Sequence, residues 1–266
     1  MVKKNKASTR YEAIIEKIFF SKYNPGDEDI PFERDDMRKM AKSLKVNLPK
    51  NLGDVIYSMR YRTPMPSKIT ATQTEGREWI IEGRGKSLYS FILVAINRLV
   101  PNKNLVAIKV PDSTPEIISA YALSDEQALL AKLRYNRLLD IFLGIATYSL
   151  QNHLRTTVQG LGQVEIDEIY VGIDKRGCQF VLPVQAKGGN DQLSAVQAKQ
   201  DIACCMEKFP DLLCRSISAQ FISSNLIALF ELTIEDGMVK IVEEKHYRLV
   251  PADQITKQDL KQYSTR

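Results

Sequence analysis

The chain has 266 residues, of which 44% are hydrophobic and 26% are charged, and this composition is typical of a soluble globular protein with one or two domains. No apolar run reaches the ~18 residues that a membrane span needs, and the basic start lacks the apolar segment of a signal peptide, so we expect a cytoplasmic protein with no membrane segment. The four cysteines show no C-x-x-C spacing and only two histidines are present, which argues against a zinc site.

The net charge of +5 is unevenly distributed along the chain. Residues 1–110 contain 21 Lys and Arg against 12 Asp and Glu, a net charge of +9, whereas residues 111–266 contain 16 against 20, a net charge of −4. A basic half suggests contact with a polyanion such as nucleic acid, although a solvated surface also explains it. Because Pro111 and Pro115 punctuate the chain at this point, we expect two domains, 1–110 and 111–266.

The first half predicts helices followed by a hairpin. Apolar residues recur at helical spacing in residues 10–23, 34–44 and 51–61. Two strand-like runs, 78–81 and 87–91, then flank a Gly-rich tip. This order is typical of a winged helix-turn-helix, in which the third helix enters the major groove and the hairpin contacts the DNA backbone.

Basic residues stand at both of the places where such a domain would contact DNA. Arg60 and Arg62 lie at the end of the third predicted helix, and Arg84 and Lys86 lie in the hairpin tip. We therefore predict these four as DNA contacts. The alternative interpretation is a helical cap whose polar face is only solvated.

The second half predicts a mixed α/β domain. Residues 125–158 read as a helical region interrupted near Gly144. Two strands follow, 163–173 and 179–187, and the turn at 174–177 with its Gly predicts a hairpin. Further on, the pattern predicts a helix at 195–209, strands at 212–222, 227–234 and 239–242, and a short final helix within 251–266. The expected fold is a mixed sheet flanked by helices.

The predicted hairpin carries acids and a lysine among apolar strand residues. A charge buried in such a strand must be paired with another charge or bind a metal. Strand alternation places Glu165 and Asp167 on one face and Glu168 on the other. On the second strand, Gln185 and Lys187 share a face. If the strands pair as the turn predicts, Asp167 lies near Gln185 and Lys187.

These groups suit a magnesium site. Mg²⁺ prefers oxygen ligands, and Asp167 offers a carboxylate, Gln185 an amide oxygen and Ala186 a backbone carbonyl. Lys187 can hold the attacking water and stabilise the charge of a phosphorane-like transition state. The alternative for Lys187 is an ordinary surface lysine, although it closes an apolar strand next to Gly188, where the backbone can approach another segment closely.

The stretches 165–172 and 184–189 resemble the active sites of the PD-(D/E)xK nuclease superfamily, in the variant whose motif is D…QxK. They are similar to sites in type II restriction endonucleases and related Mrr-type enzymes. The resemblance implies a restriction-endonuclease-like core, Mg²⁺-dependent phosphodiester hydrolysis, and catalytic roles for Asp167, Gln185 and Lys187.

The neutral Gln185 departs from the acidic pattern, so a further acid is expected to help bind the metal. Glu165 is the candidate on the same face, and we include it among the catalytic residues, although a solvated strand edge would also explain it. Glu126 is a helical candidate whose alternative role is to complement the helix dipole. Glu168 faces away unless a bulge intervenes.

The sequence thus predicts a Mg²⁺-dependent, sequence-specific double-stranded DNA endonuclease of the type II restriction type. Cutting both strands takes two active sites, so a homodimer is expected. A cognate DNA methyltransferase is the expected partner in the same system. The alternatives are a winged-helix transcription regulator without catalysis, and a repair or junction nuclease with the same active site.

Overall fold

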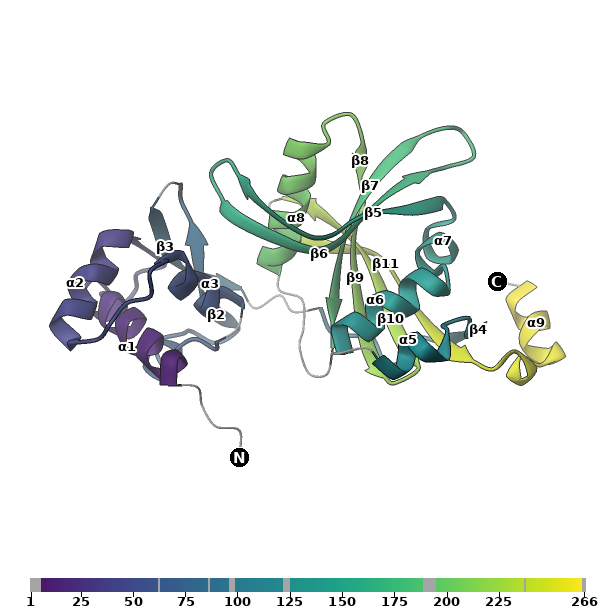
Figure 1. Cartoon of the computed structure of the whole chain (residues 1–266), viewed down its shortest axis with the longest axis horizontal. Helices are drawn as coiled ribbons and strands as arrows, with labels where there is room; N and C mark the ends of the chain where they lie inside the picture. The colour runs from purple at the N-terminus through teal and green to yellow at the C-terminus, as the bar shows by residue number, and fades with distance from the viewer. Residues whose placement is uncertain are drawn as a thin grey trace. The chain divides into compact units, whose positions relative to one another are not determined.

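The computed structural model describes residues 6–61, 63–85, 87–95, 99–121, 125–188, 195–236 and 238–264. The chain forms two compact units (Figure 1): unit 1 comprises Met1–Ile96 with Gln159–Gly162, and unit 2 comprises Asn97–Val158 with Gln163–Arg266. None of the helices in the described part is long and apolar enough to cross a membrane.

Unit 1 contains four helices and a three-stranded sheet within the described residues. The strands are antiparallel in the order β1-β3-β2, and β2 and β3 form the expected hairpin. The bounds are α1 Lys6–Phe20, β1 Asp29–Glu33, α2 Arg34–Leu44, α3 Gly53–Tyr61, α4 Ser67–Thr70, β2 Arg77–Gly83 and β3 Leu88–Ala95. Strand β1 was not expected as a strand, and it forms because Ile30 and Phe32 alternate into the core while the backbone pairs with β3.

Aromatic side chains from α1 and the sheet build the core of unit 1. The Phe19 ring packs edge-on against Trp79, with ring centroids 5.0 Å apart, and against Phe91, with centroids 5.2 Å apart. The Trp79 indole donates a 2.9 Å hydrogen bond to the Thr72 hydroxyl. The one tryptophan of the chain is therefore a core residue, and its ring is not available for stacking on a base.

Unit 2 is built on one curled mixed sheet with the strand order β4-β11-β10-β9-β7-β6-β5, and β8 pairs beside β7. Neighbouring strands are antiparallel for β6–β7, β9–β10 and β10–β11 and parallel for β7–β9 and β4–β11. The strand bounds are β4 Ala107–Pro111, β5 Ala146–Val158, β6 Gly162–Ile173, β7 Gln179–Lys187, β8 Leu213–Cys214, β9 Ser216–Ser223, β10 Leu226–Glu235 and β11 Met238–Val250.

Helices cover both faces of this sheet, which confirms the expected mixed α/β class. The helices of unit 2 are α5 Glu116–Tyr121, α6 Asp125–Tyr135, α7 Leu138–Leu143, α8 Ala195–Lys208 and α9 Lys257–Ser264 in the described part, with a 3-10 turn at Ala252–Gln254. Figure 1 shows α6 and α7 on one side of β7 and α8 on the other. The largest core lies on the α6 side and includes Leu133, Leu139, Leu182 and Val184.

The prediction of a helical region to residue 158 is wrong beyond α7. Gly144 ends that helix in the left-handed conformation, with φ of 66°, and Ala146–Val158 continues as strand β5. The strand lies at the edge of the sheet and is exposed over most of its length, so its sequence shows no alternation of buried and exposed positions.

The domain boundary expected at residue 110 falls within strand β4. This strand pairs in parallel with β11, from His246 opposite Ala107 to Val250 opposite Pro111, and so belongs to unit 2. The Pro-rich segment ends a strand of the larger sheet instead of separating the units.

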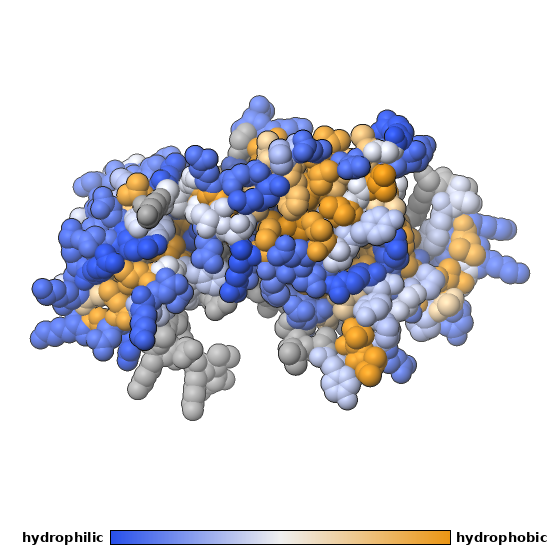
Figure 2. Space-filling view, turned by 45° about the horizontal axis from the view of Figure 1, so that its top comes forward, coloured by the Kyte–Doolittle hydropathy of each residue, from blue (hydrophilic) through white to orange (hydrophobic). Residues whose placement is uncertain are grey.

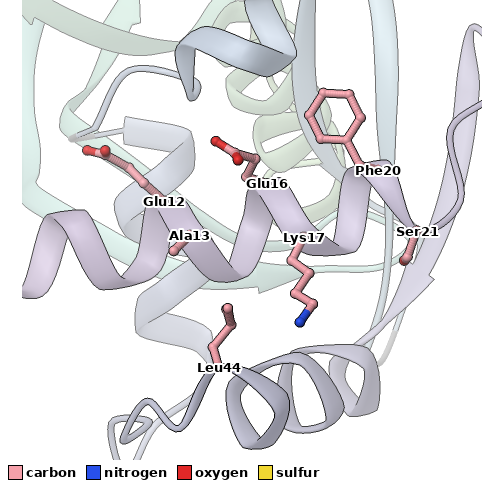
Figure 3. Close-up of a pocket in the computed structure, with 7 residues that line it drawn as sticks. All are labelled: Glu12, Ala13, Glu16, Lys17, Phe20, Ser21 and Leu44. Atoms are coloured by element: carbon pink, nitrogen blue, oxygen red, sulfur yellow. The ribbon is translucent and has the colours of Figure 1, made fainter.

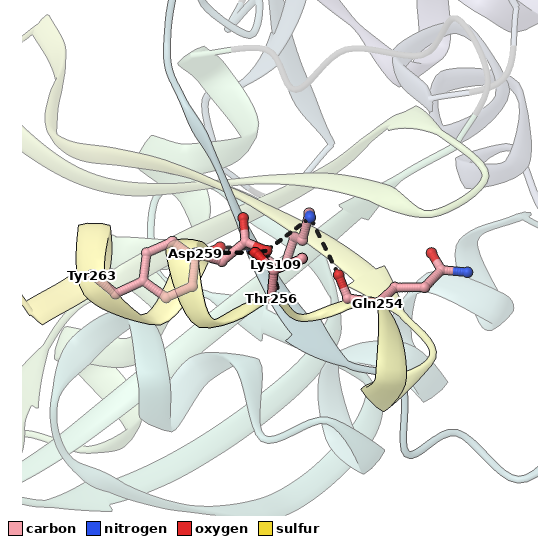
Figure 4. Close-up of polar contacts among 5 residues, drawn as sticks. All are labelled: Lys109, Gln254, Thr256, Asp259 and Tyr263. Atoms are coloured by element: carbon pink, nitrogen blue, oxygen red, sulfur yellow. Dashed lines mark hydrogen bonds and ion pairs between the residues drawn. The ribbon is translucent and has the colours of Figure 1, made fainter.

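Helix α9 covers the open edge of β4 (Figure 4). The backbone N–H of Lys109 donates to the Tyr263 hydroxyl at 2.9 Å, and the Lys109 ammonium binds Asp259 at 2.9 Å and the Gln254 carbonyl at 3.3 Å. Asp259 also accepts hydrogen bonds from the backbone N–H and hydroxyl of Thr256. The bond to Tyr263 thus satisfies one backbone N–H of an edge strand that could otherwise pair with another chain.

Candidate active site

The two faces of β7 contact different helices. The side chains of Leu182, Val184 and Ala186 lie in the core that α6 and α7 share. Gln185 alternates to the other face, where its amide nitrogen donates a 3.3 Å hydrogen bond to Asp201 of α8. Lys187, two residues further, is on the Gln185 face and is half-buried.

The acids of β6 divide between the same two faces. Glu168 is 0% exposed and accepts hydrogen bonds from Arg134 of α6 and from Ser149 of β5, the latter at 2.8 Å. Alternation along β6 then directs Glu165 and Asp167 to the α8 face, together with Gln185. The structure therefore brings Asp167, Gln185 and Lys187 together and places Glu168 on the opposite face.

The Asp167 carboxylate interrupts the backbone ladder between the two strands. Regular pairing extends from Ile173 opposite Gln179 to Glu168 opposite Val184. The N–H of Ala186 instead donates a 2.9 Å hydrogen bond to Oδ2 of Asp167. In an extended strand the N–H and C=O of one residue point to the same side, so the Ala186 carbonyl is also directed toward β6.

Burial raises the pKa of Asp167 above its ordinary value. The positive charge of Lys187, the N–H of Ala186 and His153 act in the opposite direction, and the neighbouring Glu165 adds to the increase. Asp167 is thus a poorly solvated carboxyl whose charge is only partly compensated, and a cation would favour its ionised form.

The amide of Gln185 is 2% exposed and is held at its nitrogen by two acceptors. Besides Asp201, the carbonyl oxygen of Glu165 accepts from it at 3.0 Å. Asp201 is 1% exposed, and burial raises its pKa well above the ordinary value. Sequence reasoning missed Asp201, although its place on the apolar face of α8, three residues after Ala198 and four before Cys205, was a signal.

Glu165 is engaged with basic side chains of β5. Its carboxylate accepts a 3.0 Å hydrogen bond from Arg155 and lies 3.7 Å from Nδ1 of His153. Glu165 therefore lies beside the site, and its carboxylate forms an ion pair with Arg155.

The end of β7 lies against the first turn of α6. A Cβ atom placed on Gly188 would be 2.5 Å from Cβ of Asp125 and 3.4 Å from the backbone nitrogen of Glu126. Only glycine permits this approach, as expected for Gly188. Glu126, the helical acid considered from the sequence, is thus close to the residue that follows Lys187.

The oxygen donors at this place fit a hard cation. Within the described residues no group of three or more His, Cys, Asp or Glu side chains could hold a metal ion, so a site made of acids alone is not present there. Asp167 and the adjacent β7 residues can offer one carboxylate (Asp167), one amide oxygen (Gln185) and one carbonyl (Ala186), and the Ala186 N–H is bonded to the Asp167 carboxylate. Mg²⁺ commonly keeps several waters and takes one or two carboxylates, so this set suits it.

The predicted DNA contacts belong to unit 1. Arg60 is half-buried at the end of α3, and Arg84 is exposed, with ion pairs to Asp29 at 2.9 Å and Glu82 at 3.6 Å. Arg62 and Lys86 lie outside the described residues. Several other basic residues of unit 1 are also paired with acids, so its net positive charge is less concentrated than the sequence suggests: Lys22–Asp36, Lys68–Glu16 and Arg77–Glu28.

A hollow of about 710 Å³ lies beside α1 in unit 1 (Figure 3). Its lining mixes acidic, basic and apolar side chains and contains none of the predicted site residues: Glu12, Ala13, Glu16, Lys17, Phe20, Ser21 and Leu44. On the face of the molecule in Figure 2, hydrophilic side chains predominate around smaller apolar groups. The hollow therefore adds no residue to the candidate site.

Comparison with known proteins adds no relative: no family model, no curated protein and no solved structure matches this chain.

Proposed function

We propose that this protein is a Mg²⁺-dependent, sequence-specific double-stranded DNA endonuclease of the type II restriction type, with a PD-(D/E)xK-like site. The observation that carries the proposal is the convergence of Asp167, Gln185 and Lys187 on one face of two adjacent strands, with the Ala186 N–H bonded to Asp167.

The architecture of unit 2 is compatible with a restriction-endonuclease-like core. The consecutive strands β5, β6 and β7 are neighbours, and α8 then leads to β9, which lies parallel to β7. Helix α6 packs on one face of β7, and Asp201 of α8 contacts Gln185 on the other. Compatible topology alone does not specify chemistry, so the proposal depends on the site residues.

The architecture of unit 1 is compatible with a winged-helix DNA-binding domain. Its helices precede a β2–β3 hairpin, and the sheet order β1-β3-β2 places the hairpin beside the short β1 strand. In this proposal α3 would enter the major groove and the segment between β2 and β3, with Arg84, would contact the backbone.

In the proposed reaction, Asp167, the Gln185 amide oxygen and the Ala186 carbonyl would hold Mg²⁺. When bound, the ion would polarise the scissile phosphate and lower the pKa of a water. The ammonium group of Lys187, whose charge acts on Asp167, would orient the attacking water and stabilise negative charge developing on the phosphate. The low exposure of Gln185, at 2%, would limit competing solvent around its amide.

The experiment that tests the proposal is digestion of plasmid and genomic DNA of defined methylation with Mg²⁺, followed by sequencing of the ends. Lys187→Ala should reduce cleavage at least about 100-fold while DNA binding persists. Lys175→Ala, which removes an exposed lysine from the β6–β7 turn, is the matched control and should cleave normally. Intact DNA with wild-type protein on both methylated and unmethylated substrates would reject the endonuclease.

A winged-helix transcription regulator without catalysis is the second candidate, because the topology of unit 1 supports it without reference to Asp167 or Lys187. It requires site-specific binding that Lys187→Ala leaves unchanged and no cleavage with Mg²⁺. A repair or junction nuclease would instead cleave branched or damaged DNA in preference to a linear duplex.

The proposal includes a homodimer, since each strand of the duplex needs its own active site. It also includes a cytoplasmic location and a cognate DNA methyltransferase, whose modification would protect the host sequence.

A further inference from the structure

The side-chain amide of Gln185 has both of its N–H groups directed at fixed acceptors. One acceptor is the carbonyl oxygen of Glu165 in β6, at 3.0 Å from Nε2. The other is Oδ1 of Asp201 in α8, at 3.3 Å. An amide nitrogen has two hydrogens, so these two contacts use its full donor capacity.

The orientation of this amide decides whether Gln185 can bind a cation. A carboxamide has nearly the same shape after a half-turn, but only its oxygen is an acceptor or a ligand for a hard cation. A reversed Gln185 would place Oε1 against the Glu165 carbonyl and Asp201 Oδ1, both of which are acceptors. The two acceptors therefore fix the nitrogen on their side and leave the oxygen facing elsewhere.

Asp201 occupies a position where a carboxyl group is costly. Its side chain is 1% exposed on the face of α8 that also buries Ala198, Cys204 and Cys205. Its second oxygen, Oδ2, has no hydrogen-bond partner among the described residues. A buried polar group with an unpaired atom destabilises the fold compared with an apolar residue, so its presence calls for an explanation.

We propose that Asp201 is a positioning residue that holds Gln185 with its amide oxygen available to the metal. This inference rests on the proposed function, because it assigns Asp201 to the same site. In this proposal Asp201 acts through the Gln185 amide, to which its Oδ1 is hydrogen-bonded, and it is not itself assigned as a metal ligand. The role parallels that of outer-shell groups that orient the ligands of metal sites.

Nuclear magnetic resonance of the Gln185 side-chain amide tests the positioning without metal or DNA. The two N–H signals, assigned by their loss in Gln185→Leu, should be distinct and protected from solvent exchange in the wild type. In Asp201→Ala the N–H that faces Asp201 should lose protection at least about tenfold, and in Asp201→Asn, whose Oδ1 still accepts, it should remain protected. Asp201→Leu, which fills the space of the carboxyl, replaces the alanine variant if that variant does not fold.

Calorimetric titration with Mg²⁺ alone tests the consequence for the site. Asp201→Ala should weaken Mg²⁺ binding about 10–100-fold, as loss of an outer-shell partner does, and Asp201→Asn should bind within about threefold of the wild type. Ser218→Ala is the matched control, because Ser218 is buried on β9 directly beside Gln185 and should leave Mg²⁺ affinity unchanged.

The two measurements separate this inference from the proposed function. Unchanged Gln185 amide protection in folded Asp201→Ala overturns the positioning role, whatever the nuclease activity. Equal losses of Mg²⁺ affinity in Asp201→Ala, Asp201→Asn and Ser218→Ala also overturn it, because general packing would then explain them. A wild type that neither binds Mg²⁺ nor cleaves DNA overturns the proposed function and the metal-directed role, while the amide data still report the hydrogen bond.

Discussion

The backbone N–H of Ala186 donates a 2.9 Å hydrogen bond to the Asp167 carboxylate, at the point where regular pairing of β6 and β7 ends. A side chain thus replaces a backbone acceptor in the sheet. The replacement fixes the carboxylate against β7, on the strand that also carries Gln185 and Lys187. The position of Asp167 is consequently set by the sheet itself, and its chemistry can be separated from its structural role.

Asp167→Asn should abolish cleavage and stabilise the fold. The asparagine oxygen can still accept from Ala186, but the charge for the cation is lost, and we expect cleavage to fall at least about 100-fold. Because burial raises the pKa of Asp167 above its unfolded value, the ionised form destabilises the folded protein at neutral pH. The variant should therefore have a higher Tm at pH 7.

The gain in Tm of Asp167→Asn over the wild type should become smaller as the pH falls. As the pH falls through the folded pKa of Asp167, the wild type regains the lost stability by protonation, so the difference between the proteins should shrink toward the unfolded pKa. Thermal unfolding from pH 7 to pH 4 measures this trend. A lower Tm for the variant at pH 7 would contradict the burial of an unfavourable charge.

The hairpin that carries these residues could be predicted from the sequence, because the alternation of apolar residues and the turn at Asp174–Gly177 both act locally. Strand β5 could not, since an exposed edge strand has no buried face to impose a period of two. Asp201 could not be assigned to the site either, because its contact with Gln185 depends on how α8 packs across the sheet. The local sequence pattern thus identified β6, β7 and their two faces. The contact of Asp201 with Gln185 depends on tertiary packing and could not be identified in this way.

Arg134→Ala should destabilise the protein through Glu168. Glu168 is 0% exposed, and Arg134, whose side chain is 43% exposed, is its cationic partner. Removing one partner of a buried pair costs about 3–5 kcal/mol, and the partial exposure of Arg134 lowers our expectation to about 2 kcal/mol. Urea unfolding measures the loss.

The control for this pair removes both charges. Arg134→Met combined with Glu168→Gln leaves no buried charge unpaired and should recover most of the stability. If the double variant is as unstable as Arg134→Ala, the packing of the arginine side chain matters more than its charge.

Helix α9 should detach from β4 in acid. Hydrogen bonds from Thr256 and Lys109 lower the pKa of Asp259 to about 2. Because the pKa of Asp259 is lower in the docked state than in the unfolded chain, where it is near 4, its ionised carboxylate stabilises the docked helix at pH values above about 4. This stabilisation is lost as the pH falls toward 2.

Hydrogen exchange at the Lys109 amide measures this detachment, because that N–H is bonded to Tyr263 in the docked state. Protection should fall between pH 4 and pH 2 after correction for the intrinsic exchange rate. Asp259→Asn should have low protection at both pH values. An unchanged profile in that variant would show that the carboxylate does not hold the helix.

Gly188→Ala should disturb the end of β7 and with it Lys187. The added Cβ would lie 2.5 Å from Cβ of Asp125, a distance that requires the strand end or the first turn of α6 to move. Overpacking of this kind costs about 1–3 kcal/mol, and the shift should reduce cleavage more than DNA binding. Asp125→Gly removes the Cβ atom with which the new methyl group would clash. The double variant Gly188→Ala, Asp125→Gly should therefore recover both stability and cleavage relative to Gly188→Ala alone. Recovery of stability without recovery of cleavage would mean that the carboxylate of Asp125, and not the space at Gly188, is what the site requires.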